Sequence, residues 1–398
     1  MRLIACLIFL ALWDPLFAQK TPTLMNMLPA LDAVNGEQQR QRATAMITAN
    51  YERWLKDPAA FRKLVDDECG LFPEGQLYPY FLPAMAFAQL STSDTARSRE
   101  HLARSELLLK MGLPVAGKIV DAKSDDLLQL KDYDRQATTL STVSLALGLY
   151  RWAGGTDPRL QAYHRHINQL LGLALARADG QPIHSYPNYS WNYDTVASLV
   201  ALRLAPDLTP NIPVNAIWRK HELWIQRYAY DQKNQLPYSV AGFGYTDGPS
   251  PPRGCDVFFR VMILAYVDPP AARALFARCQ QALERETGQF YGFAEYPLGA
   301  KQIEDNDSGP IIMDMGLSAT GLAIGAARAA NQPEVVSRLC RQFVFREPLL
   351  MMASTMNMQQ MPGSWFWNAV DVNPQYFTGF LFGDAVMFYS LTWNSMNR

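Results

Sequence analysis

Acidic side chains that could transfer protons stand beside aromatic residues in the sequence. Asp194 ends the Tyr-rich stretch His184–Asp194 and has Trp191 and Tyr193 close by. Apolar neighbours raise the pKa of an acid, which suits a proton donor near neutral pH. An Asp near a helix start is also a common N-cap. We weigh proton transfer and capping equally at Asp194.

Two further acids, Asp305 and Asp307, are separated by one residue and followed by Ser-Gly-Pro. Such a pair could bind substrate hydroxyls or leave one acid with a raised pKa, and a solvated acidic turn is the equally weighted alternative. Glu295 has apolar neighbours and could donate a proton, the alternative being a salt bridge to Arg253. We predict that Asp194, Asp307 and Glu295 transfer protons.

Other residues of the same loops would assist these acids. His184 titrates near neutral pH and could act as acid, base or hydrogen-bond donor, with Tyr193 in support. Arg253 would orient an anion or anchor its loop. Loops of a structural protein normally carry Gly, Ser and charged residues, so repeated Tyr and Trp favour a lined cavity. The predicted cavity walls are Tyr78, Tyr80, Trp191 and Trp365.

Three more acids fall near predicted helix starts, and we interpret Asp134, Asp256 and Asp384 as caps or packing residues. The sequence lacks a nucleophile elbow, a phosphate-binding loop and a dinucleotide fingerprint, which disfavours acyl transfer by that route, phosphoryl transfer and nicotinamide chemistry. It also lacks Cys and His at metal-ligand spacing. We predict no metal and no cofactor.

The elements that position these residues follow a repeat. Six segments carry apolar residues at helical spacing, are rich in Ala, Gly, Leu and aromatics, and are poor in charge, as buried inner helices are. They are Tyr80–Leu90, Thr138–Trp152, Val196–Leu204, Val257–Tyr266, Leu317–Ala330 and Phe380–Trp393. Their starts recur about every 60 residues, a period that suits hairpins of two helices.

Charged amphipathic stretches alternate with these segments and would form outer helices. They are Glu37–Leu55, Ala96–Lys110, Pro158–Arg177, Val214–Tyr228, Pro270–Glu286 and Glu334–Phe345. Glu37–Leu55 would pack beside the last inner helix and close the circle. The sequence therefore predicts an all-α (α/α)6 toroid of about six helical hairpins. Short β-hairpins over Leu236–Phe243 and Gln289–Tyr296 would lie beside a pocket formed by the loops at one end.

Composition limits the partners. The net charge is −1, with acids and bases interspersed, so no electrostatic footprint for nucleic acid or an anionic membrane is present. Hydrophobic residues make up 49% of the chain, enough for a large core and a lined cavity. We expect a small-molecule or saccharide substrate. The sequence leaves the oligomeric state open and allows a homo-oligomer. Of the five cysteines, four lie after residue 18 and allow three full disulfide pairings in an oxidising compartment: Cys69, Cys255, Cys279 and Cys340.

The N-terminus has the layout of a secretory signal. Arg2 precedes an apolar run, Leu3–Leu12, and Ala18 is a small residue suited to the cut. The run is too short to span a bilayer at roughly 20 residues per crossing. We predict that residues 1–18 are removed and that residues 19–398 form one (α/α)6 domain in the periplasm or outside the cell, with no membrane attachment.

Several stretches resemble a known family. Leu145–Tyr150, Tyr186–Ala197 and Phe380–Phe388 resemble inner-helix segments of the linalool dehydratase/isomerase-like group of (α/α)6 proteins. Pro252–Cys255 and Asp305–Pro310 resemble a largely uncharacterised bacterial branch of that group. The resemblance covers most of the chain after the first predicted hairpin. It implies the toroid fold and a pocket for acid–base chemistry without a cofactor.

The sequence departs from this family at its working residues. In the terpenoid enzyme two pocket cysteines and a histidine take part in dehydration and isomerisation, and the matching positions here hold His184, Tyr193 and Thr142. This departure argues against terpene-alcohol dehydration.

Three hypotheses follow from these observations. The first is a cofactor-free acid–base lyase or isomerase with an enclosed, mostly apolar pocket. The second is a glycoside hydrolase or polysaccharide lyase, an analogy of fold, with carboxylates about 5–10 Å apart. The third is a noncatalytic binding or envelope protein whose carboxylates are paired off structurally.

Overall fold

The computed structural model describes residues 31–121, 124–132, 135–187, 189–240, 250–301, 308–309, 311–346 and 373–395. These ranges contain thirteen α-helices and three small antiparallel sheets. The predicted signal at residues 1–18 and the predicted site residues Asp305, Asp307 and Trp365 lie outside them. No helix within these ranges is both long and apolar enough to cross a bilayer.

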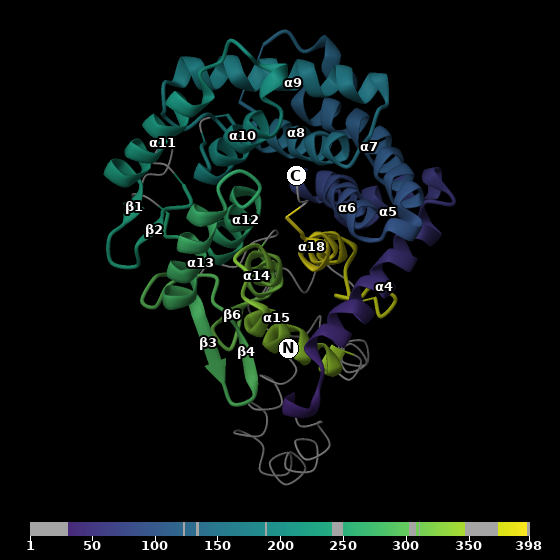
Figure 1. Ribbon diagram of the computed structural model, residues 1–398, viewed down its shortest axis with the longest axis vertical. Coiled ribbons are helices and arrows are strands. Elements are labelled where there is room, and N and C mark those ends of the chain that lie inside the picture. The colour runs from purple at the N-terminus through teal and green to yellow at the C-terminus, as the bar shows by residue number, and fades with distance from the viewer. Residues whose placement is uncertain are drawn as a thin grey trace.

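Six helices form the inner ring. They are α6 (Pro73–Ser93), α8 (Ala137–Trp152), α10 (Asn192–Leu204), α12 (Gly254–Leu264), α14 (Leu317–Ala329) and α18 (Leu381–Thr392). Each packs against the next in this order, and α18 packs against α6, so the ring is closed (Figure 1). The low charge of these sequences reflects their burial, since every residue of α8 from Ala137 to Tyr150 is buried.

Six helices surround the inner ring. They are α4 (Gly36–Trp54), α7 (Ser98–Val120), α9 (Pro158–Ala178), α11 (Val214–Tyr228), α13 (Pro269–Leu283) and α15 (Pro333–Arg341). Two of them start with an Asp-Pro pair: Asp157 accepts from the Leu160 amide and Asp268 from the Ala271 amide. Helix α4 packs against α18 and α15. The predicted closure of the ring by the N-terminal helix is therefore confirmed, and so is the all-α toroid.

Besides the predicted helical hairpins, the structure contains a further helix, three strand pairs and several 3-10 turns. Helix α5 (Pro58–Cys69) was not predicted, because it is short, charged and buries only Phe61, Val65 and Cys69. The antiparallel strand pairs are β1 (Tyr230–Asp231) with β2 (Leu236–Pro237), β3 (Glu284–Thr287) with β4 (Phe290–Phe293), and β5 (Ile311–Ile312) with β6 (Met315–Gly316). The 3-10 turns are Leu31–Ala33, Thr95–Arg97, Leu127–Gln129, Pro206–Leu208 and Gln342–Phe345. Most of these elements connect helices at the rim of the ring.

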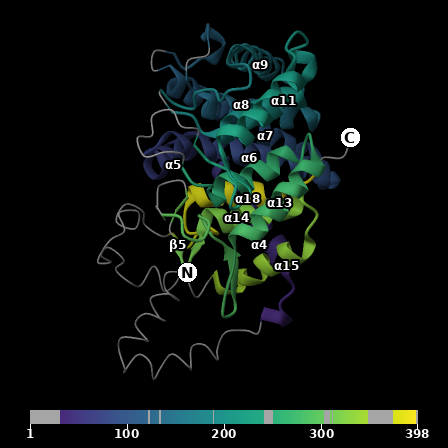
Figure 2. The same ribbon diagram turned by 90° about the vertical axis from the view of Figure 1, so that its left-hand side faces the viewer.

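The side view gives the direction of the inner helices. Strand β5, which leads into α14, lies on the left of Figure 2, and α15, which follows α14, lies on its right. At the C-terminal ends of the inner helices a buried polar cluster joins α6, α18 and the end of α12. The Gln89 amide donates to the Tyr266 hydroxyl, which lies 3.1 Å from the Tyr389 hydroxyl, and Thr392 Oγ1 donates to Gln89 Oε1 over 3.1 Å. This cluster fixes three inner helices at one end.

Three cysteine thiols lie in the helical core and not in disulfides. Cys69, Cys279 and Cys340 are buried on α5, α13 and α15, and no disulfide joins them in the described part of the chain. Burial raises the pKa of Cys69 and of Cys340 to about 12 and that of Cys279 further. The disulfide pairings that the sequence allows are therefore not formed among these three.

Two glycines provide opposite tests of helix packing. A Cβ on Gly112 of α7 would lie 2.8 Å from Tyr80 Cβ, whereas a Cβ on Gly148 of α8 would meet nothing closer than 3.7 Å. Gly112→Ala should therefore lower the free energy of unfolding by about 1–3 kcal/mol through overpacking. Gly148→Ala should raise it by about 0.5–1 kcal/mol through helix propensity. Denaturant unfolding measures both, and shifts of the same sign would contradict this packing.

Candidate active site

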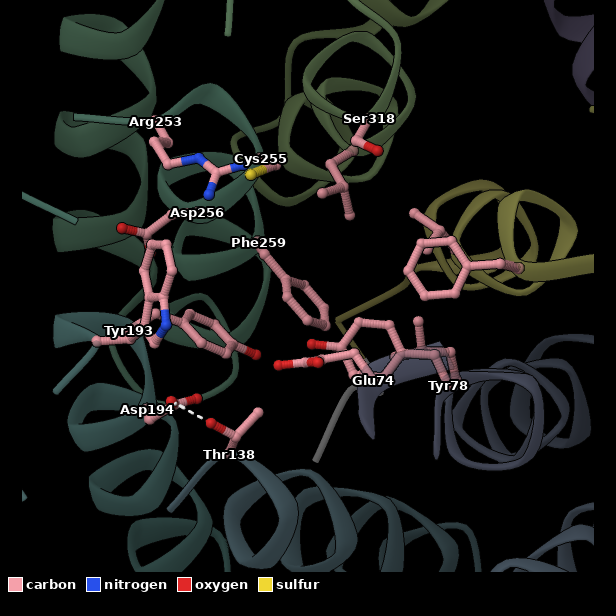
Figure 3. A pocket seen from close by; sticks show the side chains of 15 residues that line it. Glu74, Tyr78, Thr138, Tyr193, Asp194, Arg253, Cys255, Asp256, Phe259 and Ser318 are labelled. Carbon is pink, nitrogen blue, oxygen red and sulfur yellow. Dashed lines mark hydrogen bonds between the residues drawn. The ribbon is translucent and has the colours of Figure 1, made fainter. Parts of the chain in front are cut away.

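A pocket opens where the inner helices begin. All six contribute a side chain from their first turns: Glu74 from α6, Thr138 from α8, Asp194 from α10, Asp256 from α12, Ser318 from α14 and Phe382 from α18. Figure 3 shows the side chains that line this pocket. The cavity has a volume of about 80 Å³. The structure thus places a pocket at the end of the ring where the sequence predicts it.

Helical spacing selects which residues of α6 face the pocket. Glu74, Tyr78 and Leu82 line it, and they follow one another at intervals of four residues on one face of the helix. Tyr80 lies two residues from Tyr78 and so points the other way. It is fully buried against Phe61, with ring centroids 5.6 Å apart. The prediction that Tyr80 is a pocket wall was wrong, because Leu77–Pro83 is helix and not loop.

Asp194 is a buried acid at the pocket wall. Its side chain accepts from Thr138 Oγ1 over 2.6 Å and from the Ser185 hydroxyl, and the residue is 2% exposed. Burial raises the pKa of Asp194 to about 7 and outweighs these two hydrogen bonds, which lower it. The charges of Glu74 and Asp256 add to the rise. The carboxyl group can therefore hold or release a proton near neutral pH.

Glu74 is the second acid of the pocket, and sequence analysis missed it. Its side chain points toward the same space as those of Asp194 and Tyr193 (Figure 3). The Tyr186 hydroxyl donates to Glu74 Oε1. A donor at this position favours the charged carboxylate over the acid. The signal that could have revealed Glu74 is Pro73, since Pro in a first turn marks a helix start.

Aromatic rings line the side of the pocket between these acids. Tyr193 stacks on Phe259, with centroids 5.0 Å apart, and Tyr78 stacks on Phe382 at 5.6 Å. Tyr78 and Phe259 meet edge to face at 6.3 Å. Burial raises the pKa of Tyr193 well above its ordinary value, so its hydroxyl remains a neutral donor. Tyr78 and Tyr193 thus line the pocket as parts of one continuous aromatic surface.

Glu295 lies behind the pocket wall and not in it. Arg253 Nε donates to Glu295 Oε1 over 3.0 Å, and both side chains are almost completely buried. The Arg253 guanidinium also lies over the Trp191 ring, 5.3 Å from its centroid. The salt bridge considered as the alternative for Glu295 is therefore present. Arg253 and Trp191 line the pocket, whereas the role of direct proton donor does not suit Glu295.

His184 is placed beside the pocket-forming segment rather than on its wall. Its backbone carbonyl accepts from the Ala137 amide at the start of α8, over 3.1 Å. Its Nδ1 lies 3.3 Å from Ser190 Oγ. His184 thus holds the loop that carries Trp191 and Asp194 against α8, a positioning role. Direct proton transfer by His184 does not follow from this geometry.

Two acids interpreted as caps have different surroundings. Asp384 accepts from the amides of Phe377 and Thr378, over 2.9 and 2.7 Å, and from Thr378 Oγ1, as a structural acid does. Asp256 instead lines the pocket and is 7% exposed. Its Oδ1 lies 3.5 Å from Arg260 Nη2, and its carboxyl group also accepts from the Ser239 hydroxyl. Asp256 is therefore a buried acid beside the pocket, in contact with Arg260 and Ser239.

Metal ligation is not apparent in this site. Within the described ranges, no group of three or more His, Cys, Asp or Glu side chains is arranged to hold a metal ion. The pocket acids are separated from one another by aromatic and aliphatic side chains (Figure 3).

Comparisons with known proteins add evidence on the fold. The chain superposes on a family 76 glycoside hydrolase from a bovine Bacteroides thetaiotaomicron strain with a TM-score of 0.50 and 9% identity, over 79% of this chain and 68% of that one. The shared feature is the α/α toroid. A family 76 glycoside hydrolase (mannosidase) from Bacteroides thetaiotaomicron VPI-5482 gives a TM-score of 0.46 and 9% identity, over 79% and 86% of the two chains. No protein-family model and no curated protein matches the sequence.

Proposed function

We propose that this chain is a carbohydrate-active enzyme that cleaves a glycosidic bond by acid–base chemistry, with Asp194 as the proton donor. The observation that carries the proposal is a pair of pocket carboxyl groups in contrasting surroundings. Asp194 is buried, with its pKa raised to about 7, whereas Glu74 accepts from the Tyr186 hydroxyl. Glycoside cleavage needs one carboxylic acid and one carboxylate. The fold shared with a glycoside hydrolase supports the same substrate class.

The pocket residues have distinct tasks in this proposal. Asp194 protonates the leaving oxygen, and Thr138 orients its carboxyl group. Glu74, the carboxylate, activates water or attacks the sugar, and the anomeric form of the product distinguishes these two routes. Tyr193 and Phe259 present flat apolar surface to the C–H face of a sugar ring.

A second candidate keeps the same acids but changes the substrate. The pocket is lined largely by aromatic and aliphatic side chains, among them Leu82, Phe259, Leu322 and Val386. Such a lining favours a small organic molecule that loses water or rearranges, as the family resemblance implies. Asp194 would again supply the proton. We give precedence to the saccharide because it uses both carboxyl groups.

The screen that tests the proposal uses purified wild-type protein in water enriched with ¹⁸O. α- and β-linked oligosaccharides form one arm and small alcohols, terpenoid alcohols included, form the other. Hydrolysis gives shorter sugars with ¹⁸O at the new reducing end, whereas dehydration gives products lighter by one water. Products that form at the wild-type rate with Asp194→Asn would contradict the proposed role of Asp194. An alcohol-derived product alone would select the second candidate.

We further propose that residues 1–18 are removed on export and that the remaining chain works as one domain in the periplasm or outside the cell. Mass spectrometry of the protein isolated from its native host would show an N-terminus just after Ala18. An intact N-terminus at Met1 would contradict export by cleavage.

A further inference from the structure

A second cavity lies at the opposite end of the ring from the candidate active site. It opens where the inner helices α12, α14 and α18 end and the outer helices α13 and α15 begin, on the side of α13 and α15 in Figure 2. Its volume is about 700 Å³, within the range of roughly 300–1,000 Å³ that is typical of small-molecule sites. The proposed glycoside chemistry uses none of the residues that line it.

Arg328, in the last turn of α14, presents a guanidinium group to this cavity. Its Nε donates to the Trp393 carbonyl over 2.8 Å, which fixes the group against the end of α18. The two Nη groups make no hydrogen bond or ion pair with any residue that the structure describes. They are also not sealed in the core. A ligand in the cavity can therefore reach the N–H groups of both Nη atoms.

The charge of Arg328 lacks a counter-ion. Burial, together with the nearby charge of Arg40, lowers the pKa of Arg328 to about 10. Glu37 is the acid that lines the cavity, but Arg40 already pairs with it: Arg40 Nη2 and Nε donate to its two carboxylate oxygens over 2.6 and 2.8 Å. A partly buried cation without a partner is unfavourable, and an anion in the cavity would offset that cost.

Two further features add positive charge to the cavity. Arg273 of α13 lines it, is exposed, and makes no ion pair within the described ranges. Helix α15 begins at the cavity with Pro333, and its N-cap Gln332 makes no side-chain cap bond. The first turn of a helix carries a partial positive charge. Two guanidinium groups thus face one carboxylate that is already neutralised, so the cavity favours an anion.

The uncharged part of the lining indicates what else the ligand carries. Asn331, Gln332 and Ser337 contribute amide and hydroxyl groups, which both donate and accept hydrogen bonds. Ala265, Ala329 and Val336 contribute small apolar surface between the charged and polar groups. A compound with several hydroxyl groups on a compact carbon skeleton matches this mixture better than a hydrocarbon chain does.

We propose that this cavity binds a small polyhydroxylated anion, a sugar acid or a sugar phosphate, whose carboxylate or phosphate group pairs with Arg328 and Arg273. The planar guanidinium fork presents parallel N–H donors that match two oxygens of either group. The ring then carries one site at each end. The second site does not depend on the glycosidic cleavage proposed for the first.

Calorimetric titration of the purified full-length protein tests the proposal. The probes are glucuronate and glucose 6-phosphate, and glucose is the uncharged control. We expect at least one charged sugar to bind at least about tenfold more tightly than glucose, because charge-assisted hydrogen bonds are the stronger ones. Its affinity should fall as sodium chloride is added. Equal affinity for all three sugars, or no detectable binding of either charged sugar, would overturn the proposal.

Variants place the binding in the cavity. Arg328→Gln removes the charge and the fork and should weaken binding by at least about tenfold. Arg273→Glu should also weaken it, and it covers the case in which Arg328→Gln does not fold, because Arg273 is exposed. Arg219→Glu on α11 is the matched control: it makes the same charge change at an exposed position outside the cavity. The control should change the affinity by less than about twofold.

Two outcomes of these titrations would contradict the assignment. Equal losses in Arg273→Glu and Arg219→Glu would show that overall charge, and not this cavity, governs binding. A loss with Asp194→Asn but not with Arg328→Gln would place the charged sugar in the candidate active site at the other end of the ring. Either result would overturn the proposal and leave the proposed glycoside chemistry to its own test.

Discussion

Asp194→Asn should lower kcat for cleavage of an oligosaccharide by about 10²- to 10⁴-fold, because Asn cannot donate the proton that the leaving oxygen needs. The loss should shrink with an aryl glycoside whose leaving group departs without protonation. Glu74→Gln should lower kcat for both substrates, since the second carboxylate acts at the sugar carbon and not at the leaving group.

The comparison of the two substrates is the control for this prediction. A folding defect would reduce both activities by the same factor, whereas loss of the proton donor would reduce cleavage of the oligosaccharide more. The outcome that contradicts the assignment is an equal loss with both substrates in Asp194→Asn, measured as kcat on folded protein of matched concentration.

The second large effect is on stability and depends on pH. The pKa of Asp194 is about 7 in the folded protein and about 3.8 when unfolded, so the folded state loses stability as pH rises through 7. Asp194→Asn removes this loss. The free energy of unfolding of the variant minus that of wild type should therefore increase by on the order of a few kcal/mol between pH 5 and pH 8.5. Thermal or denaturant unfolding at the two pH values measures the gain.

Asp384→Asn is the matched control, because burial raises the pKa of Asp384 to about 6 as well. Its carboxylate, however, accepts from two backbone amides, and the amide group of Asn cannot accept from both. Asp384→Asn should therefore destabilise the protein at pH 5 and at pH 8.5. If Asp194→Asn behaved in the same way, Asp194 would be a structural acid, as the noncatalytic hypothesis requires.

The ring could be predicted from the sequence because its elements are long and periodic. Inner helices such as α8 combine low charge with apolar residues on all sides, and the outer helices carry clear amphipathic patterns. Helix α5 was missed because only three of its residues are buried. The inner helix α6 was predicted to start seven residues too late, because Pro79 within it looks like a helix breaker in the sequence.

That error explains much of what was missed in the site. With α6 starting at Pro73, Glu74 and Tyr78 share a face and Tyr80 lies on the other, which a loop interpretation cannot show. The partners of an acid near a helix start also separate Asp256, which lies beside the pocket and pairs with Arg260, from Asp384, which binds backbone amides. Asp194 could be found from the sequence because the aromatic residues Trp191 and Tyr193 directly precede it.

The most direct test of the central claim is a titration of the Asp194 carboxyl group itself. Infrared difference spectra of wild type and Asp194→Asn, recorded at a series of pH values, monitor this titration. The account predicts a protonated C=O band that is present at pH 6, disappears with a midpoint near pH 7, and is missing in the variant. A carboxyl group already ionised at pH 5 would contradict Asp194 as the proton donor of this pocket.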